Sequence, residues 1–157
     1  MATIKKKPSG YGQFGGFSPY GNVTAIAFFL ATNASGAVID SDTTVAVASG
    51  NVIDLGELPE GMRLDDAQIM IKTGMTATVT GSLGFKYVDG DSTEVPQDAA
   101  YFINAGDLAT AGRLRANTGK LVTLPKAARL ILTTGGAANA KASDIKVIVS
   151  GELTGPR

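Results

Sequence analysis

Alternating apolar and polar side chains between residues 76 and 88 constrain the fold of this chain more than any other feature. The stretch TATVTGSLGFKYV places its threonines, Ser82 and Lys86 on one face. The opposite face is apolar and carries Ala77, Val79, Leu83, Phe85 and Tyr87. A period of two residues is that of a half-buried β-strand, and DIKVIVSGEL at 144–153 repeats it. The pattern therefore predicts a sheet with one face toward a core.

Further segments rich in β-branched and aromatic residues lie between turn residues. They are VTAIAFFLA at 23–31, TTVAVAS at 43–49, NVIDLG at 51–56, MRLDDAQIMIKT at 62–73, KLVTL at 120–124 and AARLILTT at 127–134. Such runs are typical of strands. Pro59 and Gly61 in LPEG suit a tight turn, which predicts that 51–56 and 62–73 form a pair of strands.

One segment departs from this β pattern. The stretch DAAYFINAGDLATAGRLRAN at 98–117 predicts a loop followed by about two helical turns over 107–115. Asp107 or Asn104 would cap the helix, and Arg113 and Arg115 near its end would suit the helix dipole. The whole pattern predicts an all-β fold. We expect an antiparallel, jelly-roll-like sandwich over residues 22–157, with this one short helical insertion.

Residues 1–21 have neither the helical nor the strand period, so they are expected to form an extended N-terminal arm. The arm holds four of the ten aromatic residues of the chain, whereas disordered segments are usually poor in aromatics. We expect it to become ordered on another subunit, although a disordered tail is the simpler alternative. The candidate partner-binding residues are Lys5, Lys6, Lys7, Tyr11, Phe14, Phe17 and Tyr20. The three lysines are also explained by solvation of a terminus.

Composition excludes several classes of function. The 14 basic and 14 acidic residues cancel, so no net charge attracts the chain to nucleic acid or to an anionic membrane. The chain has no His and no Cys, which removes the Ser-His-Asp and Cys-His arrangements and the favoured zinc ligands. We expect neither catalysis nor a cofactor. A hydrolase built on paired carboxylates is the remaining enzymatic alternative.

Two further motifs are weak. The acidic turn VDGDSTEVPQD at 88–98 groups Asp89, Asp91, Glu94 and Asp98, but it lacks the register of a calcium-binding loop, so an ordinary turn explains it better. The glycine-rich stretch at 133–143 has no Lys-Ser or Lys-Thr pair after it, so it does not predict a phosphate site.

Several segments, taken in order, resemble those of small head proteins of tailed bacteriophages. They are VIDLGELPEG at 52–61, GFKYVDGD at 84–91, DAAYFINAGDLATAGR at 98–113, PKAARLILTTGGAA at 125–138 and IKVIVSGELTG at 145–155. Over residues 50–155 the chain is thus similar to the capsid decoration, or cement, proteins that coat the major capsid lattice.

The resemblance implies a structural protein of the virion, made in the host cytoplasm and placed on the capsid surface. Its implied partner is the major capsid protein, which it would bind from outside and thereby stabilise the head. A symmetric homo-oligomer is expected, and a trimer is assumed from fold-level analogy. The alternative is a tail or head-fibre module that binds a host-surface glycan.

Overall fold

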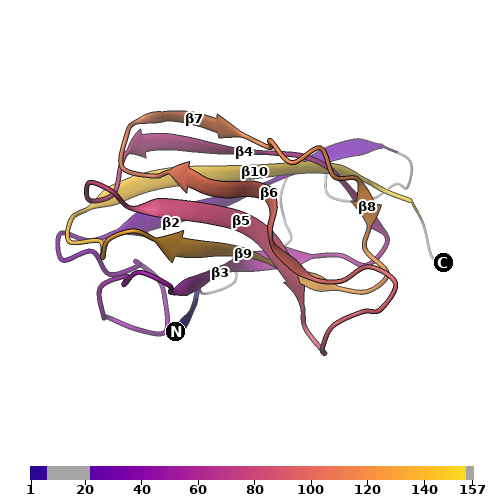
Figure 1. Ribbon diagram of the computed structural model, residues 1–157, viewed down its shortest axis with the longest axis horizontal. Helices are drawn as coiled ribbons and strands as arrows, with labels where there is room; N and C mark the ends of the chain where they lie inside the picture. The colour runs from indigo at the N-terminus through magenta and orange to yellow at the C-terminus, as the bar shows by residue number, and fades with distance from the viewer. Residues whose placement is uncertain (7–21, 155–157) are drawn as a thin grey trace.

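The computed structural model describes residues 1–6 and 22–154, and its strands run roughly along the long axis of the molecule (Figure 1). The strands are β1 (Thr3–Lys5), β2 (Val23–Thr32), β3 (Val52–Leu58), β4 (Met62–Thr73), β5 (Thr80–Tyr87), β6 (Asp98–Asp107), β7 (Gly112–Arg115), β8 (Val122–Thr123), β9 (Ala128–Gly135) and β10 (Ser143–Leu153). Sheet 1 has the order β1-β3-β9-β5-β6. Sheet 2 has the order β2-β10-β4-β7, and β8 also pairs with β4. The predicted all-β class is confirmed.

The two sheets enclose a single apolar cluster. In sheet 1, Leu132 lies between Ile53 and Leu83, and all three are fully buried. In sheet 2, Val147 lies between Phe28 and Ile69, which are also buried. Burial of large aliphatic and aromatic side chains of this kind contributes about 1.5–3 kcal/mol for each residue. The alternation predicted over 76–88 and 144–153 is confirmed within β5 and β10, where it gives the buried inner face, whereas residues 76–79 form a turn before β5.

Strands β3 and β4 do not form the predicted pair. The turn between them forms as expected, with Gly61 at φ +77° and the Met62 N–H donating to Pro59 O at 3.4 Å. However, β3 pairs with β1 and β9, whereas β4 pairs with β10, β7 and β8. The turn therefore carries the chain from one sheet to the other. Local turn chemistry could not reveal this, because it specifies a reversal but not the partner of each strand.

The predicted helix at 107–115 is wrong, and none of the described residues forms a helix. Asp107 ends β6 and accepts a hydrogen bond from the Ala109 N–H at 2.8 Å, so it caps a turn rather than a helix. Leu108 is fully buried, and its backbone bonds Val79 and Met75. Gly112–Arg115 then pairs with β4 as β7. Correspondingly, the described part of the chain contains no helix suited to cross a membrane.

The segment 43–49 is not the expected strand either. It makes one isolated bridge, Ala37–Ala46, and buries Val47. The Val47 carbonyl accepts the N–H of Asn139, a buried residue that joins several loops at this end of the sandwich. The Asn139 side chain accepts from Thr76 N at 3.0 Å and donates to Thr32 Oγ1 at 3.0 Å. Backbone contacts between loops therefore replace a strand ladder here.

Replacing Asn139 by alanine should lower the free energy of unfolding by about 2–4 kcal/mol, because several buried polar partners would lose their hydrogen bonds. Chemical denaturation measures the change. The matched control is Asn104→Ala, since Asn104 is exposed and accepts only a 3.5 Å bond from Ser82. Equal stabilities of the two variants would contradict a central role for Asn139.

Candidate interaction surfaces

The start of the chain is part of sheet 1. Thr3–Lys5 runs parallel to β3, and Ile4 is buried in the core cluster. Asp42 holds Lys5 from the other side, because Asp42 Oδ1 accepts the Lys5 N–H and the Asp42 N–H donates to Lys5 O, both at 3.0 Å. Residues 3–5 therefore belong to the sandwich, although the sequence places them in the arm.

Of the predicted partner-binding residues, only Lys5 and Lys6 fall within the described ranges. Lys6 is half-buried and bridges to Ser41. Burial lowers the pKa of Lys6, and the nearby Asp40 carboxylate partly offsets this effect. Lys7, Tyr11, Phe14, Phe17 and Tyr20 lie outside the described residues. Their role as anchors on a partner stays a prediction.

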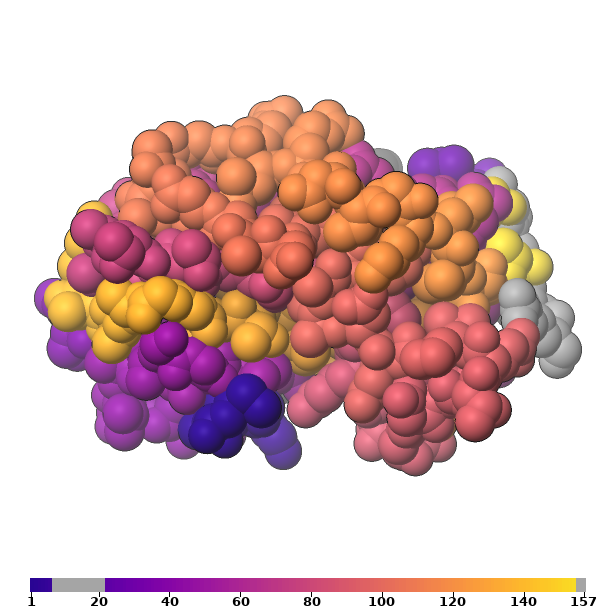
Figure 2. Space-filling model, viewed as in Figure 1, coloured from indigo at the N-terminus to yellow at the C-terminus, as the bar shows by residue number. Residues whose placement is uncertain are grey.

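A groove of about 500 Å³ lies between the loop that joins β5 to β6 and the segment that leads into β8. That loop stands out as a salmon-coloured projection in Figure 2. The apolar lining consists of Phe85, Val95, Pro96, Tyr101, Leu121 and Val122. Leu121 is 66% exposed, whereas Phe85 and Tyr101 are almost fully buried. The groove can thus accept an apolar group, but its rings offer no exposed face for stacking.

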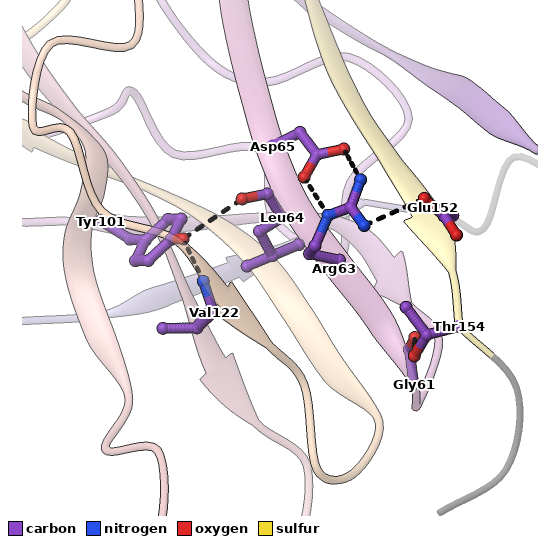
Figure 3. A network of polar contacts seen from close by, with 8 residues as sticks. All are labelled: Gly61, Arg63, Leu64, Asp65, Tyr101, Val122, Glu152 and Thr154. Atoms are coloured by element: carbon purple, nitrogen blue, oxygen red, sulfur yellow. Dashed lines mark hydrogen bonds and ion pairs between the residues drawn. The ribbon is translucent and has the colours of Figure 1, made fainter. Parts of the chain in front are cut away.

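Hydrogen bonds hold the walls of this groove in place. Tyr87 Oη donates to Val95 O at 2.7 Å, which fixes the loop, and Lys126 lies over the Tyr87 ring at 5.0 Å. Tyr101 Oη accepts the Val122 N–H at 3.0 Å and donates to Leu64 O at 3.3 Å, as Figure 3 shows. Burial raises the pKa of Tyr101, so this hydroxyl keeps its proton. These hydrogen bonds therefore fix the positions of both walls of the groove.

The rim of the groove carries an ion pair between Asp98 and Lys120. Burial alone would raise the pKa of Asp98, but hydrogen bonds from Lys120 and from the Ala100 N–H outweigh it, so the pKa is lowered. A carboxyl whose pKa is lower in the folded chain than in the unfolded chain stabilises the fold at pH values above its unfolded pKa. This contribution is lost as the pH falls through the folded pKa.

The acidic turn uses its carboxylates for internal contacts. Asp91 Oδ1 accepts the N–H groups of Ser92 at 2.8 Å and Gln97 at 2.7 Å, and Asp89 pairs with Lys126 at 3.0 Å. The described residues contain no group of three or more His, Cys, Asp or Glu side chains placed to hold a metal ion. An ordinary loop accounts for these contacts.

A second charged group lies at the start of β4. Arg63 bonds Asp65 through two nitrogens at 2.6 and 2.9 Å and Glu152 at 2.9 Å (Figure 3). The hydrogen bond to Asp65 and the charges of both carboxylates raise the pKa of Arg63. Because Arg63 occupies the space between the two carboxylates, they do not form a free acid and base pair for hydrolysis.

The fold has relatives among the solved structures. The chain is similar to one in the capsid of Ralstonia phage GP4, with 18% identity, a TM-score of 0.63 and 87% of each chain covered. It is also similar to a chain of the cyanophage Pam1 capsid, with 18% identity, a TM-score of 0.58, and 85% of this chain and 86% of that chain covered. A third is in the acid-stable capsid of Helicobacter pylori bacteriophage KHP30, with 14% identity, a TM-score of 0.51, and 85% of this chain and 94% of that chain covered. At these identities the likeness shows a shared fold. No protein-family model and no curated protein matches the sequence.

The groove was missed at the sequence level because its walls are far apart in the chain. Val95 and Leu121 meet only because β6 and the segment before β8 lie side by side. The loop expected before the helix, over 98–106, is also wrong, because these residues form β6, and the role of Tyr101 in that strand was missed with it. The sequence held one signal, the apolar Leu121 directly after Lys120. The prediction of a strand over 120–124 already accounted for an apolar residue there, so the signal was not used.

Replacing Lys120 by glutamine should raise the pKa of Asp98, because burial of the carboxyl would remain while its charge partner is lost. A carboxyl-carbon NMR titration measures this pKa. Asp107 serves as the internal control, because its pKa is lowered by hydrogen bonds from Thr110 and Ala109. An unchanged Asp98 pKa would exclude Lys120 as its partner in solution.

Proposed function

We propose that this chain is a structural protein of a tailed-phage virion that binds the outside of the major capsid lattice and stabilises the head. The observation that carries the proposal is a fold shared over 85% or more of the chain with chains from three phage capsids. A jelly-roll-like sandwich of this size supplies a rigid body with broad surfaces, as a decoration protein requires.

Chemistry among the described residues supports a non-enzymatic role. The carboxylates of the acidic turn and of the Arg63 group are engaged by backbone N–H groups or by cations. Buried Tyr101 holds two backbone groups rather than a ligand. Such side chains make contacts but offer no reacting pair. On a lattice, modest contacts add up because each one is repeated, and a segment tethered to a docked body binds at a high effective concentration.

The segment 7–21, with its four rings, is the proposed partner-binding element. The described chain reaches Lys6 in sheet 1 and resumes at Asn22 before β2, so the segment is attached to the sandwich at both ends. A segment attached in this way reaches at most half its contour length, which is about 25 Å. Its partner must therefore be a closely packed neighbour, such as a capsomer or an adjacent decoration subunit.

Replacing Tyr11, Phe14, Phe17 and Tyr20 together by serine should weaken binding to heads about tenfold or more, since aromatic anchors dominate such interfaces. The probe is empty heads that lack this protein, from the phage whose genome encodes the chain. Co-sedimentation of the purified chain with these heads measures the binding. The variant retains residues 1–6, because Ile4 belongs to the core.

A matched control replaces Val45 and Val88, two exposed apolar residues outside both the segment and the groove lining, by serine. Full binding by the four-ring variant would refute the anchoring role of the segment. No binding by the wild-type chain would refute the decoration function itself. Binding of the wild-type chain to a glycan array instead would favour the fibre-module alternative.

A further inference from the structure

The groove and the segment 7–21 lie at opposite edges of the sandwich. Sheet 1 has β1 at one edge and β6 at the other, and sheet 2 has β2 at one edge. Strand β2 lies against β3, which is next to β1, whereas β6 lies against β7. The described chain stops after β1 and resumes before β2, so the segment is attached at the β1–β2 edge. The groove is lined from β6 and from the residues that lead into β8, so it opens at the other edge.

Strand register places the groove and the two ends of the segment at the same level along the strands. In sheet 1, one cross-strand row runs from β3 to β6 and consists of Gly56, Leu130, Phe85 and Asp98. The last two of these residues line the groove. At the other edge, the Lys6 N–H donates to Asp54 O at 3.4 Å, so the segment begins beside this row.

Sheet 2 shows the same correspondence. Its row runs from β2 to β8 and consists of Thr24, Gly151, Leu64 and Val122. Val122 lines the groove, and Thr24 follows closely on Asn22, where the described chain resumes. Each wall of the groove is therefore level with one attachment point of the segment, across the width of the sandwich.

The segment is poorly placed to enter the groove of its own chain. Four strand spacings of about 4.8 Å separate β1 from β6, which makes about 19 Å. The segment reaches at most about 25 Å from its attachment points. It would have to run extended across the sheet and back, with little length left to enter the groove. When two copies meet edge to edge, by contrast, the segment of one copy starts next to the groove of the other.

The charges of the segment and of the groove are complementary. Residues 7–21 contain one cation, Lys7, and no acidic residue. The loop over 88–98, which forms one wall of the groove, contains four acidic residues and no basic one. Asp89 and Asp98 pair with lysines from outside the loop, so acidic groups outnumber these lysines. Attraction between opposite charges favours approach of the segment to this loop.

The rings of the segment recur at every third position. They are Tyr11, Phe14, Phe17 and Tyr20. Three residues per turn is the period of a polyproline II helix, in which rings at this spacing would share one side. Phe14 is the middle residue of 7–21, so it can reach furthest from the two attachment points. Its ring also has no hydroxyl that needs a partner, which suits the apolar groove lining around the exposed Leu121.

We propose that the groove binds the segment 7–21 of a second copy of this chain, with Phe14 against Leu121. The inference rests on the proposed role of 7–21 as the partner-binding element, and it names the partner. The contact is head to tail, because one edge of each copy meets the opposite edge of the next. Since the segment ends and the groove are level, successive copies are related by a rotation about an axis parallel to the strands, without a shift along it. Head-to-tail contacts of this kind close into a ring, and a trimer is one such ring.

Disulfide trapping in the full-length chain tests this contact, because the chain has no Cys of its own. Phe14→Cys combined with Leu121→Cys should form disulfides between chains on mild oxidation. Non-reducing electrophoresis should then show multiples of the 16.0 kDa chain mass. Phe14→Cys combined with Ala111→Cys is the matched control and should stay at the mass of one chain. Ala111 is exposed at the same edge, but it precedes β7, which pairs with the far end of β4.

Mixing two single-cysteine variants distinguishes a neighbour's groove from the chain's own. Equal amounts of Phe14→Cys and Leu121→Cys chains should give a linked pair at twice the 16.0 kDa chain mass. Mass spectrometry of the digested pair should find a peptide that joins positions 14 and 121. An internal disulfide between these positions, in a double variant that keeps the mass of one chain, would instead show that the segment enters its own groove.

Sedimentation velocity over a concentration series measures the same contact without cysteines. Leu121→Asp should raise the dissociation constant of the oligomer about tenfold or more, because a carboxylate would face an apolar ring. Ala111→Asp, at an exposed site outside the groove, should leave the dissociation constant unaltered. Circular dichroism of each variant verifies that the sandwich has folded.

Two results would overturn the inference. They are a double-cysteine variant that forms no 14–121 disulfide between chains, and an oligomer that Leu121→Asp leaves intact. A chain that binds heads without this cross-link would keep the decoration function and exclude the neighbour's groove as the site of the segment. Cross-linked chains that do not bind heads would refute the decoration function and leave this inference standing, so the two failures are distinguishable.

Discussion

Contact between the inner faces of the two sheets is the constraint on which the rest of the structure depends. Leu132 and Val147 lie at the centres of these faces, each flanked by buried neighbours from two other strands. Most consecutive strands belong to opposite sheets, so most connections cross between the layers, and β5–β6 and β7–β8 are the exceptions. Hydrogen bonds of the turn at Pro59–Gly61 and of Asn139 hold these connecting segments in place. The outer faces remain available for partners because the core is enclosed from both sides.

Sequence periodicity predicted the class of fold and the strands with one buried face. It was accurate for β5 and β10, because period-two alternation reports directly on burial. It failed where the structure of a segment depended on hydrogen bonds to residues far away in the sequence. Asp107 and Arg113 suit a helix end, yet pairing of Gly112–Arg115 with β4 draws the segment into a sheet. The 43–49 segment alternates like a strand, but its backbone bonds loops that the sequence cannot place.

The candidate surfaces were less predictable than the fold. The concentration of aromatic residues in 7–21 is visible in the sequence, and it still carries the proposal for partner binding. Residues 3–5, by contrast, pack into sheet 1, which no local pattern indicated. The groove and the outer surfaces of the two sheets exist only through strand pairing. Ile148 and Gln68 become neighbours because β10 pairs with β4, although the two residues are far apart in the chain.

These features describe a protein whose function depends on surfaces rather than on reacting groups. A closed sandwich and a ring-bearing segment attached to it at both ends suit repeated assembly on a lattice. A cryo-electron-microscopy reconstruction of heads from the phage that encodes the chain tests this claim most directly. The account predicts sandwich density on the outside of the shell, with residues 7–21 against an adjacent subunit. Density inside the shell, or heads without the protein, would contradict it.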